Sequence, residues 1–233
     1  MTEISPNSLD HVALWVADRD ALEEFATRYL GMHVIEKTEK FTLVGADARR
    51  GKLTLFDAEG PREPGPLERV VLRVRDLDAA LAVLPDDVEV HRGNGGVAAF
   101  DAPEGLGVGL VAANGASGPD YDLDHVVLRV PDPDSTAGEL ERLGFDRNGD
   151  GRLTIDDKDV RLRAGDAGAG DKPLLNHLAM LVDSADEVRQ EAERRGMEVA
   201  DFVDAPNTLA VFVWGPDRIK LEYVEHKPGF SLT

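Results

Sequence analysis

The chain has 233 residues, 42% hydrophobic side chains and a formal net charge of −19, so it can fill one large or two ordinary globular cores. Such an acidic chain is not expected to bind nucleic acid or anionic membranes, since both select Lys and Arg. It contains no cysteine, so any metal must be held by histidine and carboxylate groups. The sequence shows no leader and no apolar run long enough to span a membrane, so we expect a cytoplasmic protein. We expect its partner to be a small-molecule substrate, and it could also form homo-oligomers.

One short pattern recurs four times along the chain, at spacings of roughly 50 to 60 residues. Each copy is an apolar strand that ends on an acidic or serine turn, at 9–18, 67–76, 123–132 and 175–184. After the first copy, Asp18 can cap a helix that Gly31 stops. Its inward face is predicted to carry Leu22, Phe25, Ala26 and Tyr29.

The later copies are followed by helices of the same kind. Shorter ones are predicted around 78–84 and 135–143, and a longer one runs from Asp183 or Ser184 to Arg195, before Gly196. Alternating segments broken by Gly, Asn or Asp turns then predict hairpin strands. These segments are 33–45, 52–58, 88–93, 96–102, 107–113, 152–157, 159–165, 209–215 and 219–225.

The pattern therefore predicts four βαβββ units, an α+β fold of two similar halves with curled mixed sheets. Linkers rich in Pro, Gly and Asp separate the units at 58–66, 113–122 and 165–173. We expect the middle linker to divide the chain into domains 1–115 and 116–233.

The third position of each opening strand should point to one face of its sheet, because side chains two apart share a face. Aligning strand ends gives a matching position on each closing strand. The opening positions are His11, Arg69, His125 and His177, and the closing positions are Thr54, Gly109, Arg163 and Glu222.

If units three and four close against each other, His125, His177 and Glu222 line one concavity. Two imidazoles and one carboxylate are the ligand set of non-haem Fe(II) oxygenases, which predicts a metal site. In the N-terminal half, His11 would meet Arg69 and Gly109, neither of which is a ligand. We therefore expect His11 to be structural and domain 1–115 to be a degenerate copy without metal.

The four LDHVxL-type strands, the βαβββ units and the closing GPDRIKLEYVE resemble the vicinal oxygen chelate superfamily over almost the whole chain. This superfamily includes glyoxalase I, methylmalonyl-CoA epimerase, bleomycin-resistance proteins and extradiol dioxygenases. A four-unit chain is most similar to the two-domain extradiol dioxygenases. The resemblance implies the metal ligands His125, His177 and Glu222, with Fe(II) first and Mn(II), Ni(II) or Zn(II) as alternatives.

The closing strands depart from the extradiol pattern. Pro216 and Glu222 keep the motif's spacing, but Phe212 stands where the family has Tyr. Residues 203–205 and 126–176 lack the family's catalytic histidines. We therefore consider His226 and Lys220 as catalytic replacements that could transfer protons.

Other candidates follow from the same alignment. Arg129 and Arg163 could hold an anionic substrate group, with Phe212 beside them, and Arg163 stands where glyoxalase I and the epimerase have a fourth ligand. The segment 146–157 matches a calcium-loop spacing, yet it falls where the other units have a hairpin, which favours a plain turn.

Three functions are left open by the sequence. The leading one is an Fe(II) extradiol-type ring-cleaving dioxygenase that acts on a vicinal diol. The second is a glyoxalase- or epimerase-like metal-dependent isomerase or lyase. The third is a non-catalytic small-molecule-binding protein like the bleomycin-resistance members, which predicts no metal. The scaffold alone does not choose among them.

Overall fold

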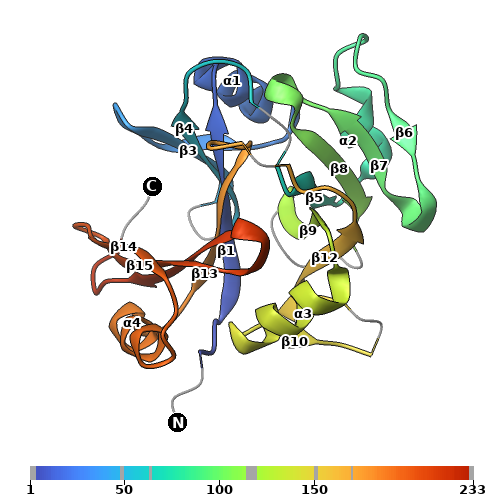
Figure 1. Cartoon of the computed structure of the whole chain (residues 1–233). Coiled ribbons are helices and arrows are strands. Elements are labelled where there is room, and N and C mark those ends of the chain that lie inside the picture. Colours follow the sequence, from blue (N-terminus) through green and yellow to red (C-terminus); the bar gives the residue numbers. More distant parts are fainter. Residues whose placement is uncertain are drawn as a thin grey trace.

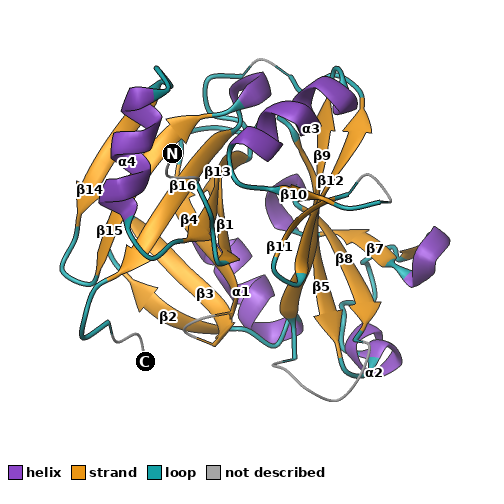
Figure 2. Cartoon of the chain, turned by 90° about the horizontal axis from the view of Figure 1, so that it is seen from below, coloured by secondary structure: helices purple, strands orange, loops and turns teal. Residues whose placement is uncertain are grey.

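The computed structural model describes residues 4–47, 50–62, 65–113, 120–149, 152–168 and 170–230. These residues form four α-helices and two eight-stranded sheets, which lie side by side (Figure 1; Figure 2). The predicted α+β fold of four βαβββ units is confirmed. No helix in the described ranges is both long enough and apolar enough to cross a membrane.

Each unit runs from an opening strand through a helix to three further strands. Unit one consists of β1 (Ser8–Val16), α1 (Arg19–Tyr29), β2 (His33–Lys37), β3 (Phe41–Asp47) and β4 (Arg50–Asp57). Unit two consists of β5 (Leu67–Val74), α2 (Leu77–Ala82), β6 (His91–Arg92), β7 (Ala98–Asp101) and β8 (Gly107–Ala112). Unit three consists of β9 (Asp122–Val130), α3 (Pro133–Arg142), β10 (Asp146–Arg147), β11 (Leu153–Ile155) and β12 (Lys158–Ala164). Unit four consists of β13 (Leu175–Leu181), α4 (Ala185–Arg194), β14 (Val199–Asp204), β15 (Thr208–Trp214) and β16 (Lys220–His226).

The units pair in a nested order. The first sheet has the strand order β14-β15-β16-β13-β1-β4-β3-β2 and joins unit four to unit one; the second, β10-β11-β12-β9-β5-β8-β7-β6, joins unit three to unit two. The seams are antiparallel pairs, β1 with β13 and β5 with β9. The expected closure of unit three on unit four is therefore wrong, and the sheets do not follow the division into 1–115 and 116–233. All four opening strands carry the same apolar alternation, so this pattern cannot select a partner.

The first and fourth helices begin at the caps that the sequence predicts, whereas α3 begins at Pro133, two residues before the expected start, with Asp132 as its cap. The Asp18 side chain accepts a hydrogen bond from the Ala21 backbone N at 2.9 Å, and Ser184 caps α4 in the same way. Gly31 follows α1 with φ of 59°, a left-handed conformation that glycine adopts most easily. A Cβ added there would lie 2.4 Å from the Tyr121 ring, so this glycine also lets unit three pack against unit one.

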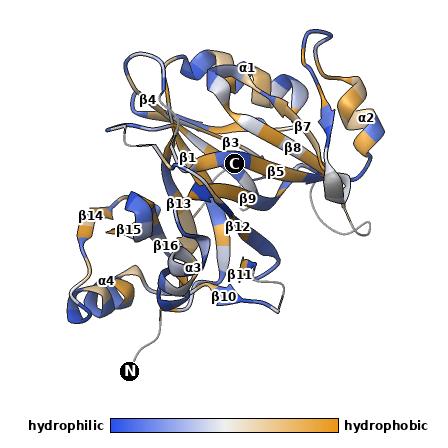
Figure 3. Ribbon diagram, turned by 45° about the vertical axis from the view of Figure 1, so that its right-hand side comes forward, coloured by the Kyte–Doolittle hydropathy of each residue, from blue (hydrophilic) through white to orange (hydrophobic). Residues whose placement is uncertain are grey.

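Alternation along the strands separates a core face from a polar face. On β1, Val12, Leu14 and Val16 enter a hydrophobic cluster that includes residues of both sheets. Figure 3 shows the hydrophobic colouring running along the strands of the two sheets. The Tyr223 hydroxyl of β16 donates to the backbone O of Leu143 at 2.6 Å, which ties the first sheet to unit three. We call the opposite, concave faces the first cup, of units one and four, and the second cup, of units two and three.

The segment with calcium-loop spacing contains a short hairpin. Strands β10 and β11 pair antiparallel, and the Asn148 backbone N donates to the Arg152 backbone O at 3.0 Å. The next element is the strand β12 rather than an exit helix. Two residues of the calcium pattern, Asp150 and Gly151, lie outside the described residues, so calcium binding stays an untested prediction.

Candidate metal centre

His11, His177 and Glu222 come together in the first cup. Each lies on a central strand of that sheet, β1, β13 and β16 respectively. Glu222 Oε2 lies 2.8 Å from His177 Nε2 and 3.3 Å from His11 Nε2, and the two Nε2 atoms are 3.4 Å apart. Within the described residues, this is the group of His and acidic side chains whose ligand atoms converge, all within 4.8 Å of one another.

The spacing of the three ligand atoms fits one divalent metal ion. Bonds of about 2.1 Å separate neighbouring ligand atoms by about 3.0 Å at octahedral angles and by about 3.4 Å at tetrahedral angles. The observed separations of 2.8, 3.3 and 3.4 Å fall close to this range. All three side chains are at most 13% exposed. The geometry and the donor types therefore suit a first-row metal bound on one triangular face.

The strand register shows which residue stands at a fourth ligand position. On β16, Glu222 is the register partner of Ala179, two residues after His177. The corresponding partner of Ala13, two residues after His11, is Thr54 on β4. Thr54 is buried and faces the same cavity. The first cup thus offers two imidazoles, one carboxylate and a hydroxyl where a second carboxylate could stand.

Each histidine is held from behind by the residue that precedes it. His11 Nδ1 lies 2.8 Å from Asp10 Oδ2, and His177 Nδ1 lies 3.1 Å from Asn176 Oδ1. Such contacts fix the tautomer that leaves Nε2 free for a metal. The two imidazoles therefore present their Nε2 atoms toward Glu222.

Burial and charge shift the pKa values of all three residues. Burial alone would raise the pKa of Glu222, but His177 and His11 outweigh it and lower that pKa to about 2. Burial would lower the pKa of His11, but hydrogen bonds to Asp10 and Glu222 raise it to about 9. Burial lowers the pKa of His177, against the attraction of Glu222. Glu222 is thus ionised at neutral pH, as a metal ligand must be.

His125 does not belong to this group. It lies on β9 in the second sheet, where its Nδ1 is 2.6 Å from Asp124 Oδ1. The expected ligand set of His125, His177 and Glu222 is therefore corrected to His11, His177 and Glu222. The expectation that the N-terminal half offers no ligand does not fit this geometry either, because His11 belongs to the group that could hold a metal. Unit four closes on unit one, so His11 takes the place expected for His125.

The second cup has other residues at the equivalent positions. The register pairs Val71 with Gly109 and Val127 with Arg161. Gly109 therefore matches the sequence expectation, whereas the position expected for Arg163 belongs to Arg161. The four residues that correspond to Thr54 and the ligands of the first cup are Arg69, Gly109, His125 and Arg161.

The two arginines expected to hold an anionic substrate lie away from the three ligands. Arg129 Nη2 is 3.2 Å from Glu68 Oε2, and Arg163 Nη1 is 2.8 Å from Glu68 Oε1. Both arginines belong to the second sheet, and neither lines the cavity of the first cup. Their expected role at the metal site is therefore wrong, because they share the carboxylate of unit two.

A cavity of about 370 Å³ opens onto His11, His177 and Glu222. Phe212 lies on its wall, with its ring centroid 5.2 Å from that of His177 in an edge-to-face arrangement. His226 also lines it, stacked on the Phe230 ring at 3.7 Å. Apolar side chains and polar ones, among them Lys52, Thr54 and Asn207, line the cavity together. The rest of its apolar lining consists of Phe41, Leu43, Phe56, Ala205, Pro206 and Val224, besides Phe230.

Lys220 lies on β16, two residues before Glu222, and is half-buried. Burial lowers the pKa of its ammonium group, against the attraction of Glu222. Its Nζ lies 5.8 Å from the ring centroids of both Phe212 and Trp214. Lys220 thus sits beside the ligand group rather than among the residues that line its cavity.

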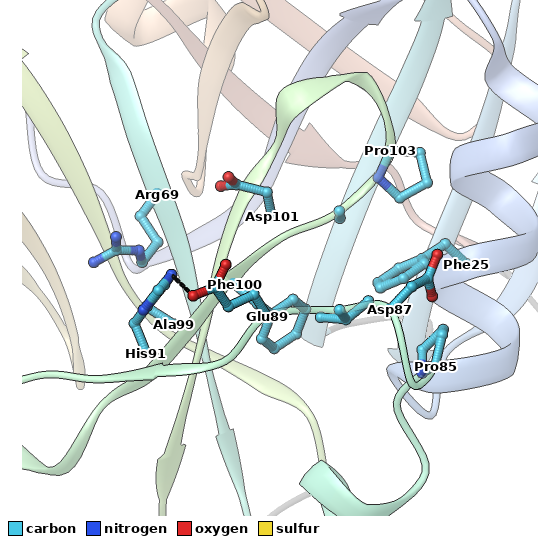
Figure 4. Close-up of a pocket in the computed structure, with 12 residues that line it drawn as sticks. Phe25, Arg69, Pro85, Asp87, Glu89, His91, Ala99, Phe100, Asp101 and Pro103 are labelled. Atoms are coloured by element: carbon cyan, nitrogen blue, oxygen red, sulfur yellow. Dashed lines mark ion pairs between the residues drawn. The ribbon is translucent and has the colours of Figure 1, made fainter.

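A larger cavity, of about 620 Å³, lies over unit two (Figure 4). Arg69, His91 and Asp101 are among the residues that line it. Figure 4 marks an ion pair between His91 Nε2 and Glu89 Oε1, which are 3.7 Å apart. None of the described residues around it forms a cluster of metal-ligating atoms. Cavity size therefore does not identify the candidate metal site; the converging ligand atoms in the smaller cavity do.

The sequence indicates His11 as a candidate ligand once the assumption that unit three pairs with unit four is dropped. His11 occupies the same third position of an opening strand as His177, and Asp10 precedes it as Asn176 precedes His177. Comparing all pairs of units, rather than neighbouring units alone, would have included His11, His177 and Glu222 among the candidate sets.

Comparisons with known proteins agree with this architecture. The family model described as Glyoxalase/Bleomycin resistance protein/Dioxygenase superfamily matches residues 8–106. No curated protein matches the chain. A candidate dioxygenase of Bacillus subtilis strain 168 is 17% identical with a TM-score of 0.77, over 98% of this chain and 88% of that one.

Two other solved structures share the fold over nearly the whole chain. Glyoxalase I from Zea mays is 16% identical with a TM-score of 0.70, over 94% of this chain and 92% of that one. The cppA protein from Streptococcus pneumoniae TIGR4 is 16% identical with a TM-score of 0.67, over 94% of this chain and 98% of that one. The family model thus matches the chain from β1 to the residue before β8, and the likeness to these solved structures shows a shared fold over all four units.

Proposed function

We propose that this chain is a metal-dependent vicinal oxygen chelate enzyme, and that it is an extradiol-type dioxygenase that cleaves the ring of a vicinal diol. The observation that carries the proposal is the group of His11, His177 and Glu222, with Thr54 at the fourth position. Two imidazoles and one carboxylate suit Fe(II) best, with Mn(II), Ni(II) or Zn(II) as alternatives. A metal held by these three side chains would be able to bind both oxygens of a diol as well.

A divalent metal bound here supplies Lewis acidity and a template for two vicinal oxygens. His11, His177 and Glu222 would hold it, with Asp10 and Asn176 behind the imidazoles. Thr54 adds no charge, so the protein ligands contribute a single negative charge from Glu222. A site with a bound divalent ion would therefore keep net positive charge, which would favour the deprotonated, anionic form of a diol.

The aromatic walls of the cavity suit a flat ring. Phe56 and Phe212 flank His177, with ring centroids 6.2 and 5.2 Å from its imidazole. Phe41 stacks in a tilted arrangement on Phe56 from the next strand. These side chains would orient an aromatic diol edge-on toward the ligands and exclude water from the reacting oxygens.

His226 is our candidate for the group that takes a proton from the diol. It lies four residues after Glu222 on β16, so both side chains face the cavity. Stacking on Phe230 orients its ring, and its Nε2 lies 3.9 Å from Asp10 Oδ1. Lys220 is the weaker candidate, because it lies beside the aromatic pair of Phe212 and Trp214.

Anaerobic reconstitution with Fe(II), followed by assays against a panel of catechols, tests the proposal. We expect oxygen consumption matched by a ring-opened chromophore, with activity lost in His177→Ala and kept in His125→Ala. The absence of a ring-opened product with every diol would overturn the dioxygenase assignment.

The same experiment distinguishes the dioxygenase from the second enzymatic candidate. A glyoxalase- or epimerase-like isomerase or lyase would bind the metal and turn over its substrate without oxygen. A purified protein that neither contains nor accepts a divalent metal would instead support a binding protein of the bleomycin-resistance kind. Elemental analysis before reconstitution, then titration with metal, divides these outcomes.

For His226, the informative variant is His226→Gln. We expect it to retain the metal affinity of the wild type and to lose at least about tenfold in kcat, since general-base catalysis contributes about 10²- to 10⁴-fold. The pH dependence of kcat should also lose its acidic limb. Full activity with an unchanged pH profile would exclude His226 as the proton acceptor.

A further inference from the structure

The two histidine ligands have different partners behind them, and we propose that Asp10, fixed by Lys52, is a positioning residue that makes His11 the stronger donor. The inference rests on the proposed metal site, and it concerns residues that do not contact the metal themselves. Lys52 contributes to the same effect, because its ion pair with Asp10 holds the carboxylate in place.

Asp10 is at the centre of a buried polar cluster. Its Oδ2 atom lies 2.8 Å from His11 Nδ1 and 2.9 Å from Lys52 Nζ. The side chains of Asp10 and Lys52 are only 4% and 3% exposed. A buried carboxylate is tolerated when its charge is paired, and here the ammonium group provides the pair. The carboxylate is thus held from two sides and cannot turn away from His11 without losing its own partner.

His177 has a weaker arrangement at the equivalent place. Its Nδ1 atom faces the neutral Oδ1 of Asn176 at 3.1 Å. A carboxylate accepts a hydrogen bond more strongly than an amide, and it increases the electron density on the opposite nitrogen of the ring. His11 should therefore bind a metal more strongly than His177 does, although both stand at the same strand position.

The lysines of the two units are inequivalent too. Lys52 stands two residues before Thr54, and Lys220 stands two residues before Glu222, so they occupy matching positions on β4 and β16. Lys52 reaches Asp10, whereas Lys220 has its Nζ 5.8 Å from the Trp214 ring centroid. The two histidines therefore differ twice: in the residue that contacts Nδ1, and in whether a lysine pairs with that residue.

The backbone leaves room for this arrangement. Gly45 on β3 is the register partner of Lys52, and a Cβ added to it would lie 2.8 Å from Lys52 Cγ. The same Cβ would lie 3.0 Å from Ile35 Cδ1. Any other residue at this position would have to displace the lysine stem. Gly45 is thus required for the path that Lys52 takes to Asp10.

The test compares two matched aspartate variants by competition of Zn²⁺ between the protein and a chromophoric chelator. Asp10→Asn should weaken Zn²⁺ binding about ten- to a hundredfold, the range for loss of a partner behind a ligand. Asp124→Asn is the control, because Asp124 Oδ1 lies 2.6 Å from His125 Nδ1 in the second cup. This control should leave Zn²⁺ affinity within about twofold of the wild type. Equal affinities for wild type and Asp10→Asn would overturn the inference.

A second measurement needs no variant. In the Co²⁺-loaded wild type, the Nδ1–H protons of the two histidines should shift outside the ordinary NMR range if both rings bind the metal. We expect the His11 proton to exchange with water more slowly than the His177 proton, because its acceptor is a carboxylate at shorter distance. Equal exchange rates, or the reverse order, would contradict the proposed inequality even if Asp10→Asn failed to fold.

The two proposals fail in different ways. If the wild type binds none of Zn²⁺, Co²⁺ and Fe²⁺, the metal site itself is wrong. If the wild type binds Zn²⁺ and Asp10→Asn binds it equally well, only the role of Asp10 is wrong. Gly45→Ala offers a milder change: by pushing Lys52 aside it should weaken Zn²⁺ binding in the same direction, by less than Asp10→Asn.

Discussion

The two cups share one backbone plan and carry different chemistry at the same four positions. The first cup places two imidazoles, a carboxylate and a hydroxyl where the second places two arginines, a glycine and one imidazole. Those residues are His11, Thr54, His177 and Glu222 in the first cup, and Arg69, Gly109, His125 and Arg161 in the second. The scaffold therefore determines where side chains converge, and residue identity determines whether they form a ligand set.

The largest difference between the two cups is expected when equivalent histidines are removed from each. His177→Ala should weaken binding of a divalent metal by more than about a hundredfold. This is more than the loss expected when only a residue behind a ligand is removed. His125→Ala should leave it unchanged, since its ring faces Asp124 in the second cup. Calorimetric titration of both variants checks this. Equal losses in the two would contradict the assignment of the site to the first cup.

Metal binding should stabilise the first cup by mass action. At free metal of about 100 times Kd, the free energy of unfolding should rise by about 2.7 kcal/mol. For a chain of this size the increase corresponds to about 5–10 °C in Tm. Scanning calorimetry with and without metal measures it, and Glu222→Gln should abolish the shift. A shift of the same size in Glu222→Gln would place the metal elsewhere.

The pH dependence of metal affinity should follow His11. Its pKa of about 9 in the metal-free protein means that the ring is protonated at neutral pH, and a metal must displace that proton. Affinity should therefore rise about tenfold per pH unit from pH 7 toward 9 and level off above the pKa. Titrations in buffers of different ionisation enthalpy would count the released proton. A flat profile over this window contradicts the prediction.

The smallest expected effect concerns the joint between the two sheets. Tyr223→Phe removes the hydrogen bond from the Tyr223 hydroxyl to the Leu143 backbone O. It should lower the free energy of unfolding by about 1 kcal/mol, the usual contribution of one such bond. Denaturant titration measures the loss. Metal affinity should not change, because the Tyr223 side chain enters the core on the face opposite Glu222. A large drop in affinity would instead show that the joint orients β16.

Local features of the fold could be predicted from the sequence because they depend on local chemistry. Asp18 and Ser184 cap helices as expected, and strand alternation places Glu222 and Thr54 on the concave face. The position expected for Arg163 belongs to Arg161, because loops decide where a strand ends while hydrogen bonds decide its register.

The partner of each unit could not be predicted. His11 and His125 follow the same LDHV pattern, and each lies beside an aspartate that accepts from its Nδ1. Local pattern therefore makes them equivalent, and only the long-range pairing of β1 with β13 distinguishes them. Proximity along the chain favoured unit three as the partner of unit four, and the nested order overrides it.

The nested order also has a consequence for how the protein is made. His11 and His177 are 166 positions apart, and the whole second sheet lies between them along the chain. Units two and three can pair as soon as both leave the ribosome, whereas β1 must wait for β13, the opening strand of unit four. During synthesis the first sheet therefore exposes the unpaired edge of β1 longest. Metal capture by His11, His177 and Glu222 can occur only once that wait is over, so it would serve as a late marker of completed folding.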